Sequence, residues 1–108
     1  MKILPYRAQT GMGDTFDIEF PLHEATSDAV KVGQLVSALL DAIDKEIAFA
    51  GEVSNGDVLQ AMAMAMAIRT GTIHARPEAT PLLSRQLVDT ALNAVSASTR
   101  STSTAGHA

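Results

Sequence analysis

The sequence predicts a mainly helical domain, at the margin of the α+β class, with an N-terminal β arm or hairpin and a disordered C-terminal tail. Three observations predict it. Residues 58–68 read V-L-Q-A-M-A-M-A-M-A-I, and two further segments repeat apolar residues at helical spacing. Residues 16–20 instead alternate apolar side chains with carboxylates. We therefore expect a single domain over residues 1–95, with the β arm in residues 1–22, and a tail over residues 96–108.

The β arm begins at Lys2–Tyr6, a short strand that Pro5 places at an edge or near its own end. Alternation in Phe16–Phe20 is the clearest strand pattern of the chain, and Pro21 is expected to close that strand. One or two strands alone are marginal in water. The ribbon therefore needs a covering helix or a further strand.

A first long helix is expected from about Thr26 to about Ala50. Thr26 or Ser27 can cap it, and Gly51 is a natural stop at its C-terminal end. Its apolar stripe consists of Val32, Val36, Leu39, Leu40, Ile43 and Ile47. Phe49 falls off this stripe, so we expect it to contact something other than the face of its own helix.

The second helix is the Ala/Met run, capped by Ser54 or Asn55, and it either stops near Gly71 or continues to His74. On a helical wheel one face holds Val58, Leu59, Met62, Met66 and Ile73, and the opposite face holds Ala61, Met64, Ala65 and Ile68. A helix that is apolar on both sides must be covered on both sides. We expect the first helix on one side, and the third helix or a second subunit on the other.

Arg76-Pro77 ends the second helix, and a third helix opens with Thr80 as its cap and Pro81 at its first position. The apolar side of this third helix consists of Leu83, Leu87, Val88, Ala91 and Val95. From Ser96 on, seven of thirteen residues are Ser or Thr. Such a composition buries too little apolar surface to offset the entropy of ordering, which predicts the disordered tail.

Charge is distributed unevenly along the chain. The formal net charge is −4, with ten acids and four bases in residues 1–57 but two acids and four bases in residues 58–108. An acidic surface repels phosphate, so nucleic-acid binding is disfavoured. Asp41, Asp44 and Glu46 are the candidate acidic patch. They either form a solvated face, or dock a basic partner protein as a nucleic-acid mimic would.

No catalytic, cofactor-binding or metal-binding residue is predicted. The chain has no cysteine, which excludes disulfides, a thiol nucleophile and thiolate metal ligands. His23 and Glu24 are the nearest acid/base pair, but adjacent residues point in different directions. The three histidines do not show metal-ligand spacing. The alternative is an enzyme that uses His23 or His74 at a subunit junction.

We therefore expect a non-catalytic, acidic protein-interaction module that self-associates, as a dimer, and that can also bind another protein. The residues expected at the interface are Met62, Met64, Met66, Ile68 and Phe49. Methionine also suits an adaptable partner site or an apolar pocket, so a carrier of apolar ligands is a second alternative. The longest apolar run is too short to span a bilayer, and the cysteine-free sequence is compatible with the cytoplasm.

Overall fold

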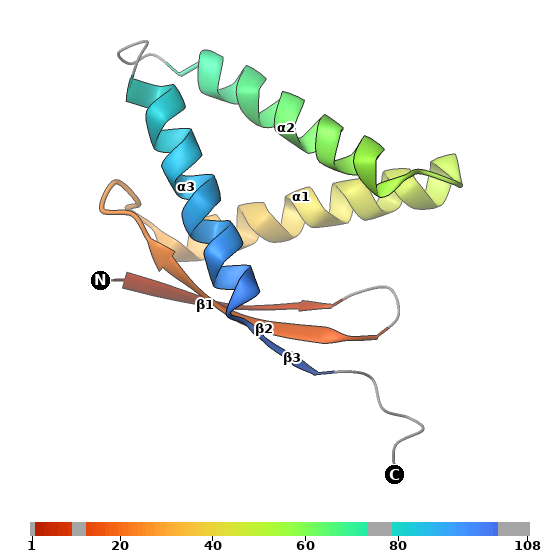
Figure 1. Cartoon of the computed structure of the whole chain (residues 1–108), viewed down its shortest axis with the longest axis horizontal. Helices are drawn as coiled ribbons and strands as arrows, with labels where there is room; N and C mark the ends of the chain where they lie inside the picture. Colours follow the sequence, from red (N-terminus) through yellow and green to blue (C-terminus); the bar gives the residue numbers. More distant parts are fainter. Residues whose placement is uncertain (1, 10–12, 74–78, 102–108) are drawn as a thin grey trace. The chain divides into compact units, whose positions relative to one another are not determined.

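The computed structural model describes residues 2–9, 13–73 and 79–101 (Figure 1). Three helices and three strands follow one another in the order β1, β2, α1, α2, α3, β3, which confirms the mainly helical class with an N-terminal hairpin. Contacts within the chain define two compact units, and the expectation of one domain over residues 1–95 stays a prediction. The sheet unit comprises Met1–Ala29 and Leu87–Ala108, and the helical unit comprises Val30–Gln86.

The hairpin is longer and more regular than the sequence predicts. β1 (Lys2–Gln9) pairs antiparallel with β2 (Thr15–Leu22), and Tyr6 lies opposite Ile18. Pro21 does not close β2, because it pairs with Ile3 inside the strand. Since side chains alternate across a strand, one face of the hairpin is apolar. That face carries Leu4, Tyr6, Ala8, Phe16, Ile18 and Phe20.

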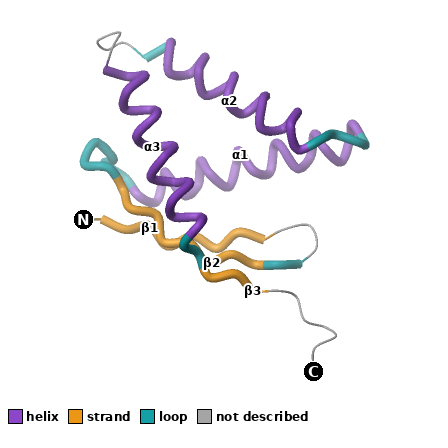
Figure 2. The backbone as a smooth tube through the Cα atoms, in the orientation of Figure 1, coloured by secondary structure: helices purple, strands orange, loops and turns teal. Residues whose placement is uncertain are grey.

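A third strand completes the sheet, in the order β1-β2-β3 (Figure 2). β3 (Thr99–Ser101) pairs antiparallel with residues 15–17 of β2, in a segment that was expected to belong to the tail. All three of its residues, Thr99, Arg100 and Ser101, are polar, so the segment gives no apolar–polar alternation that would predict a strand. The rest of the expected tail, residues 102–108, lies outside the described residues.

α1 (Ala29–Ala50) begins slightly later than expected and ends where the glycine predicts. Thr26, a candidate cap, instead closes a turn, in which its backbone N–H donates to the His23 carbonyl at 2.8 Å. At the other end, the N–H of Gly51 donates to the Ile47 carbonyl at 3.0 Å. Gly51 has φ 87°, a left-handed conformation that glycine adopts without the steric cost of a Cβ.

α2 (Asn55–Gly71) begins with a capping box at Ser54. The Ser54 hydroxyl accepts a hydrogen bond from the Asp57 backbone N–H at 3.1 Å, and the Asp57 carboxylate accepts one from the Ser54 N–H at 3.4 Å. The helix ends at Gly71, with Thr72 as its C-terminal cap, rather than continuing to His74. His74 and the expected breaker Arg76-Pro77 lie outside the described residues.

α3 (Ala79–Ser96) starts before its expected cap. Thr80 and Pro81 therefore both lie in the first turn, where the missing N–H of proline removes no helical hydrogen bond. In the helical unit, the Thr70 and Ser84 hydroxyls form a hydrogen bond of 2.9 Å that connects α2 to α3.

Because the Ser54 hydroxyl accepts the hydrogen bond from the Asp57 N–H at the start of α2, replacing that side chain should destabilise this helix. We predict that Ser54→Ala lowers the free energy of unfolding by about 0.5–2 kcal/mol and reduces the helical signal in circular dichroism. Gln60→Ala, an exposed change in the middle of the same helix, is the control and should preserve the signal. Equal stability of Ser54→Ala and the wild type would show that the capping box does not stabilise α2.

Candidate interaction surface

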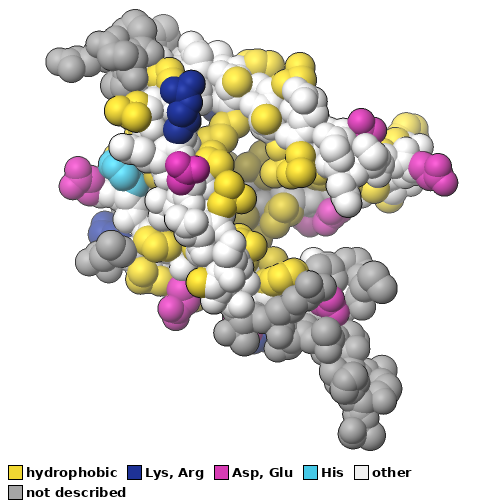
Figure 3. Space-filling model, viewed as in Figure 1, with side chains coloured by type: hydrophobic (Ala, Val, Ile, Leu, Met, Phe, Trp, Pro, Cys, Tyr) yellow, Lys and Arg dark blue, Asp and Glu magenta, His cyan; other side chains and the backbone are white. Residues whose placement is uncertain are grey.

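α2 is apolar along most of its length, yet no residue of α2 is buried. Between its first turn and Arg69 the only polar side chain is Gln60. Contrary to expectation, neither side of α2 is buried by another helix of the chain. Hydrophobic side chains lie uncovered on the surface along its course (Figure 3). This exposure makes α2 the main candidate for an interaction surface.

The helix presents two apolar faces, which we name after their central methionines. The Met64 face consists of Ala61, Met64, Ala65 and Ile68, and the Met62 face consists of Val58, Leu59, Met62 and Met66. Ile73, which the sequence placed on the second face, lies beyond the end of α2 at Gly71. Met64 is 55% exposed and Ile68 is 67% exposed. Met62 and Met66 are less open, at 43% and 38%. The methionine of the Met64 face is therefore more accessible to solvent than either methionine of the Met62 face.

Phe49, the fifth expected interface residue, lies in the last turn of α1 and is 88% exposed, the highest value among the large apolar side chains described. α1 also exposes Val30 and Leu35, which the sequence analysis did not select. Leu35 lies one helical turn before Leu39, and this spacing was the available signal. The exposed apolar surface thus extends over α1 as well as α2.

The candidate acidic patch is not gathered on one face. Asp41, Asp44 and Glu46 are all exposed on α1. At about 100° per residue, Glu46 lies about 140° around the helix from Asp41, while Asp44 lies about 60° from it on the other side. Lys45 lies next to Asp41 on the surface, one turn further along. The three carboxylates therefore form an ordinary mixed surface on this helix rather than one patch.

His23 has a structural role in the turn before α1. Its Nδ1 accepts a hydrogen bond from the Ala25 backbone N–H at 3.0 Å, and the side chain is half-buried. Over residues 2–9, 13–73 and 79–101 there is no group of three or more His, Cys, Asp or Glu side chains that could hold a metal ion. His74, the other histidine considered for catalysis, lies outside the described residues, as does His107.

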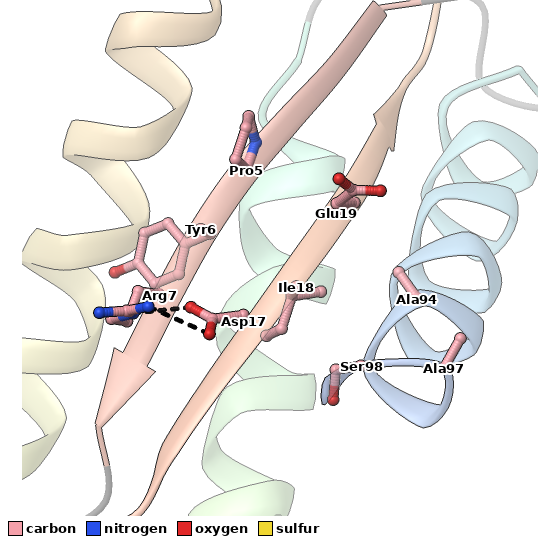
Figure 4. A pocket seen from close by; sticks show the side chains of 9 residues that line it. All are labelled: Pro5, Tyr6, Arg7, Asp17, Ile18, Glu19, Ala94, Ala97 and Ser98. Atoms are coloured by element: carbon pink, nitrogen blue, oxygen red, sulfur yellow. Dashed lines mark hydrogen bonds and ion pairs between the residues drawn. The ribbon is translucent and has the colours of Figure 1, made fainter. Parts of the chain in front are cut away.

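A shallow open cavity of about 640 Å³ lies within the sheet unit, between the hairpin and the last turn of α3 (Figure 4). Ile18 faces Ala94 and Ala97 across it, and Ile18 is the one buried apolar side chain among the described residues. No methionine lines this cavity. It is therefore not the methionine-lined pocket that an apolar carrier would need.

Arg7 and Asp17 flank this cavity as a cross-strand ion pair. The Nε of Arg7 donates to Oδ1 of Asp17 at 2.6 Å, and Nη2 donates to Oδ2 at 3.1 Å. These hydrogen bonds, together with the positive charge, hold the pKa of the Asp17 carboxyl below its ordinary value. The same hydrogen bonds raise the pKa of Arg7. Because the two residues are directly opposite in the ladder, the pair reinforces the hairpin register.

Comparisons with known proteins identify no relative from which the role of this surface could be inferred. No family model matches the chain, and no curated protein and no solved structure shows a significant match to it. Within the described residues, α1, α2 and α3 each lack the combination of length and apolar composition that crossing a bilayer requires. The surface must therefore be interpreted from its own chemistry.

The Arg7–Asp17 pair gives a pH-dependent prediction. Because the pKa of Asp17 is lowered in the folded hairpin, its stabilisation is fully present above the ordinary Asp pKa of about 3.9. That stabilisation is lost as the pH falls through the lowered value. We predict that Arg7→Gln raises the pKa of Asp17, measured by NMR titration of its carboxyl carbon.

Lys2→Gln removes a cation from the same strand, at the far end of the ladder from Asp17, and is the matched control. It should leave the Asp17 midpoint where it is in the wild type. An unchanged midpoint in Arg7→Gln would mean that the ion pair does not persist in solution.

Proposed function

We propose that this protein is a non-catalytic interaction module that self-associates through α2. The observation that supports this proposal most directly is the exposure of α2. Leu59, Met64 and Ile68 are each more than half exposed, although each is a large apolar side chain. Contiguous apolar surface of this kind marks sites of protein association in water-soluble chains.

The exposed side chains of α2 support a partner with an apolar surface of its own. Leu59 and Ile68 are 66% and 67% exposed, and Met64 is 55% exposed. Covering these side chains with a second molecule would remove apolar surface from water, which is favourable in proportion to the area removed.

The energetics of folding lead to the same proposal. Fixing the backbone of one residue costs about 1–2 kcal/mol, and apolar burial is the main term that offsets this cost. Among the described residues, only Ile18 supplies a buried apolar side chain. Complete burial of a Met, Leu or Ile side chain contributes about 1.5–3 kcal/mol. α2 carries several such side chains that the chain itself leaves in water, so association would supply the missing stabilisation.

A second copy of the chain is the partner that this proposal requires. Every copy presents the same apolar helix, and a two-fold arrangement places identical surfaces against each other. The residues proposed for the contact are Met62, Met64, Met66 and Ile68 of α2, with Phe49 of α1 at its edge. We propose a cytoplasmic location, in keeping with the absence of cysteine from the sequence.

The proposal predicts that the wild-type protein has at least twice the mass of one chain in light scattering at micromolar concentration. Met64→Glu should weaken this association by about tenfold or more, because burying an unpaired carboxylate costs more than about 1.4 kcal/mol. Because α2 depends on association for its stability, the dissociated variant should also lose part of its helical signal in circular dichroism.

Gln60→Glu adds the same charge to the same helix at its one polar position, and is the control. It should change the association by less than about threefold. A wild-type protein that is folded and monomeric at every concentration would overturn the proposal. The same conclusion would follow if Met64→Glu and Gln60→Glu associated equally well.

A further inference from the structure

Large and small side chains alternate along the Met64 face. In chain order the face reads Ala61, Met64, Ala65, Ile68, which is small, large, small, large. Met64 and Ile68 project from the helix with more than half of their surfaces exposed, and both alanines are exposed as well. Packed interiors fill space with few voids, so the order of sizes restricts how two such faces can meet.

We infer that two copies of α2 pack antiparallel across their Met64 faces, an arrangement that rests on the self-association proposed above. With the two-fold axis between Met64 and Ala65, Met64 lies opposite Ala65 of the second copy. In the same register, Ala61 lies opposite Ile68 of the second copy. Every large side chain then meets a small one, which is the complementarity that close packing requires.

A parallel arrangement in register lacks this complementarity. It places each methionine against the same methionine and each alanine against the same alanine. The large side chains then hold the helices apart, and the alanine layers between them are left underpacked. The sizes of the side chains on this face therefore favour the antiparallel pair.

The charges of α2 favour the same orientation. Its two charged residues are Asp57, in the first turn, and Arg69, in the last. They lie about 18 Å apart along the helix axis. An antiparallel pair brings the acidic end of each helix to the basic end of the other, whereas a parallel pair brings like charges together. The side-by-side, antiparallel alignment of the two helix dipoles adds to this preference.

The absence of cysteine from the chain allows a direct test, because a single introduced thiol can react only with its copy. A disulfide requires Cα atoms within about 7 Å of each other. In the antiparallel register the two copies of residue 65 are about 1.5 Å apart along the helix axes, and those of residue 61 about 10 Å apart. We expect Ala65→Cys to form a covalent dimer under mild oxidation at least about tenfold faster than Ala61→Cys.

Two further samples complete the experiment. A mixture of Ala61→Cys and Ile68→Cys should form the mixed disulfide, because these positions face each other in the antiparallel register. Ala63→Cys lies on another side of α2 and should not crosslink. The amount of each covalent dimer is measured on a non-reducing gel. Light scattering of the wild type, in the same buffer, shows whether the protein associates at all.

The outcomes separate the two proposals. If the wild type associates but Ala61→Cys crosslinks as fast as Ala65→Cys, the helices are parallel and the orientation is wrong, while self-association stands. Crosslinking of Ala63→Cys that is faster than that of Ala65→Cys would also overturn the Met64-face arrangement. The same holds if the wild type associates in light scattering but none of the cysteine variants crosslinks. A monomeric wild type would remove both proposals together.

Discussion

Burial of the apolar circumference of α2 is the requirement on which the rest of this structure depends. The helix forms for local reasons, since its residues are good helix formers and Ser54 caps its first turn. Local preference alone does not hold a helix of this length in water, where tertiary packing supplies most of the stability. Within the described residues, nothing buries either apolar face of α2. Its stability is thus tied to whatever covers those faces.

The sheet unit buries one of its own apolar side chains, whereas α2 buries none. Most apolar side chains of its hairpin share one face, where Tyr6 and Phe20 meet edge to face with ring centroids 6.5 Å apart. Ile18 is buried on that face, and the opposite face carries the Arg7–Asp17 pair. Register, ring contact and ion pair all act between the neighbouring strands β1 and β2. The two units therefore differ in where their described contacts lie: the sheet unit holds the one buried apolar side chain among the described residues, and α2 holds none.

Much of this architecture could be predicted from sequence because its signals are local. Helical periodicity, the glycine stop at Gly51 and the cap at Ser54 each act within a few residues, and all three appear in the structure. β3 could not be predicted, since its strand character comes from pairing with β2 and its own residues carry no alternation. Likewise, two apolar faces show that α2 needs a cover, but periodicity cannot identify what covers it. Sequence alone therefore indicated the candidate surface and left its occupant open.

The pairing of β3 with β2 has a consequence for the order in which the molecule is assembled. The paired residues of these strands that lie nearest in the chain, Asp17 and Thr99, are 82 positions apart, and every residue of the helical unit falls between them. On the ribosome, the hairpin emerges before the helices, and the third strand follows all of them. α2 is thus exposed on a nascent chain while the sheet is still incomplete. The sheet is therefore completed only after every residue of the helical unit has been synthesised.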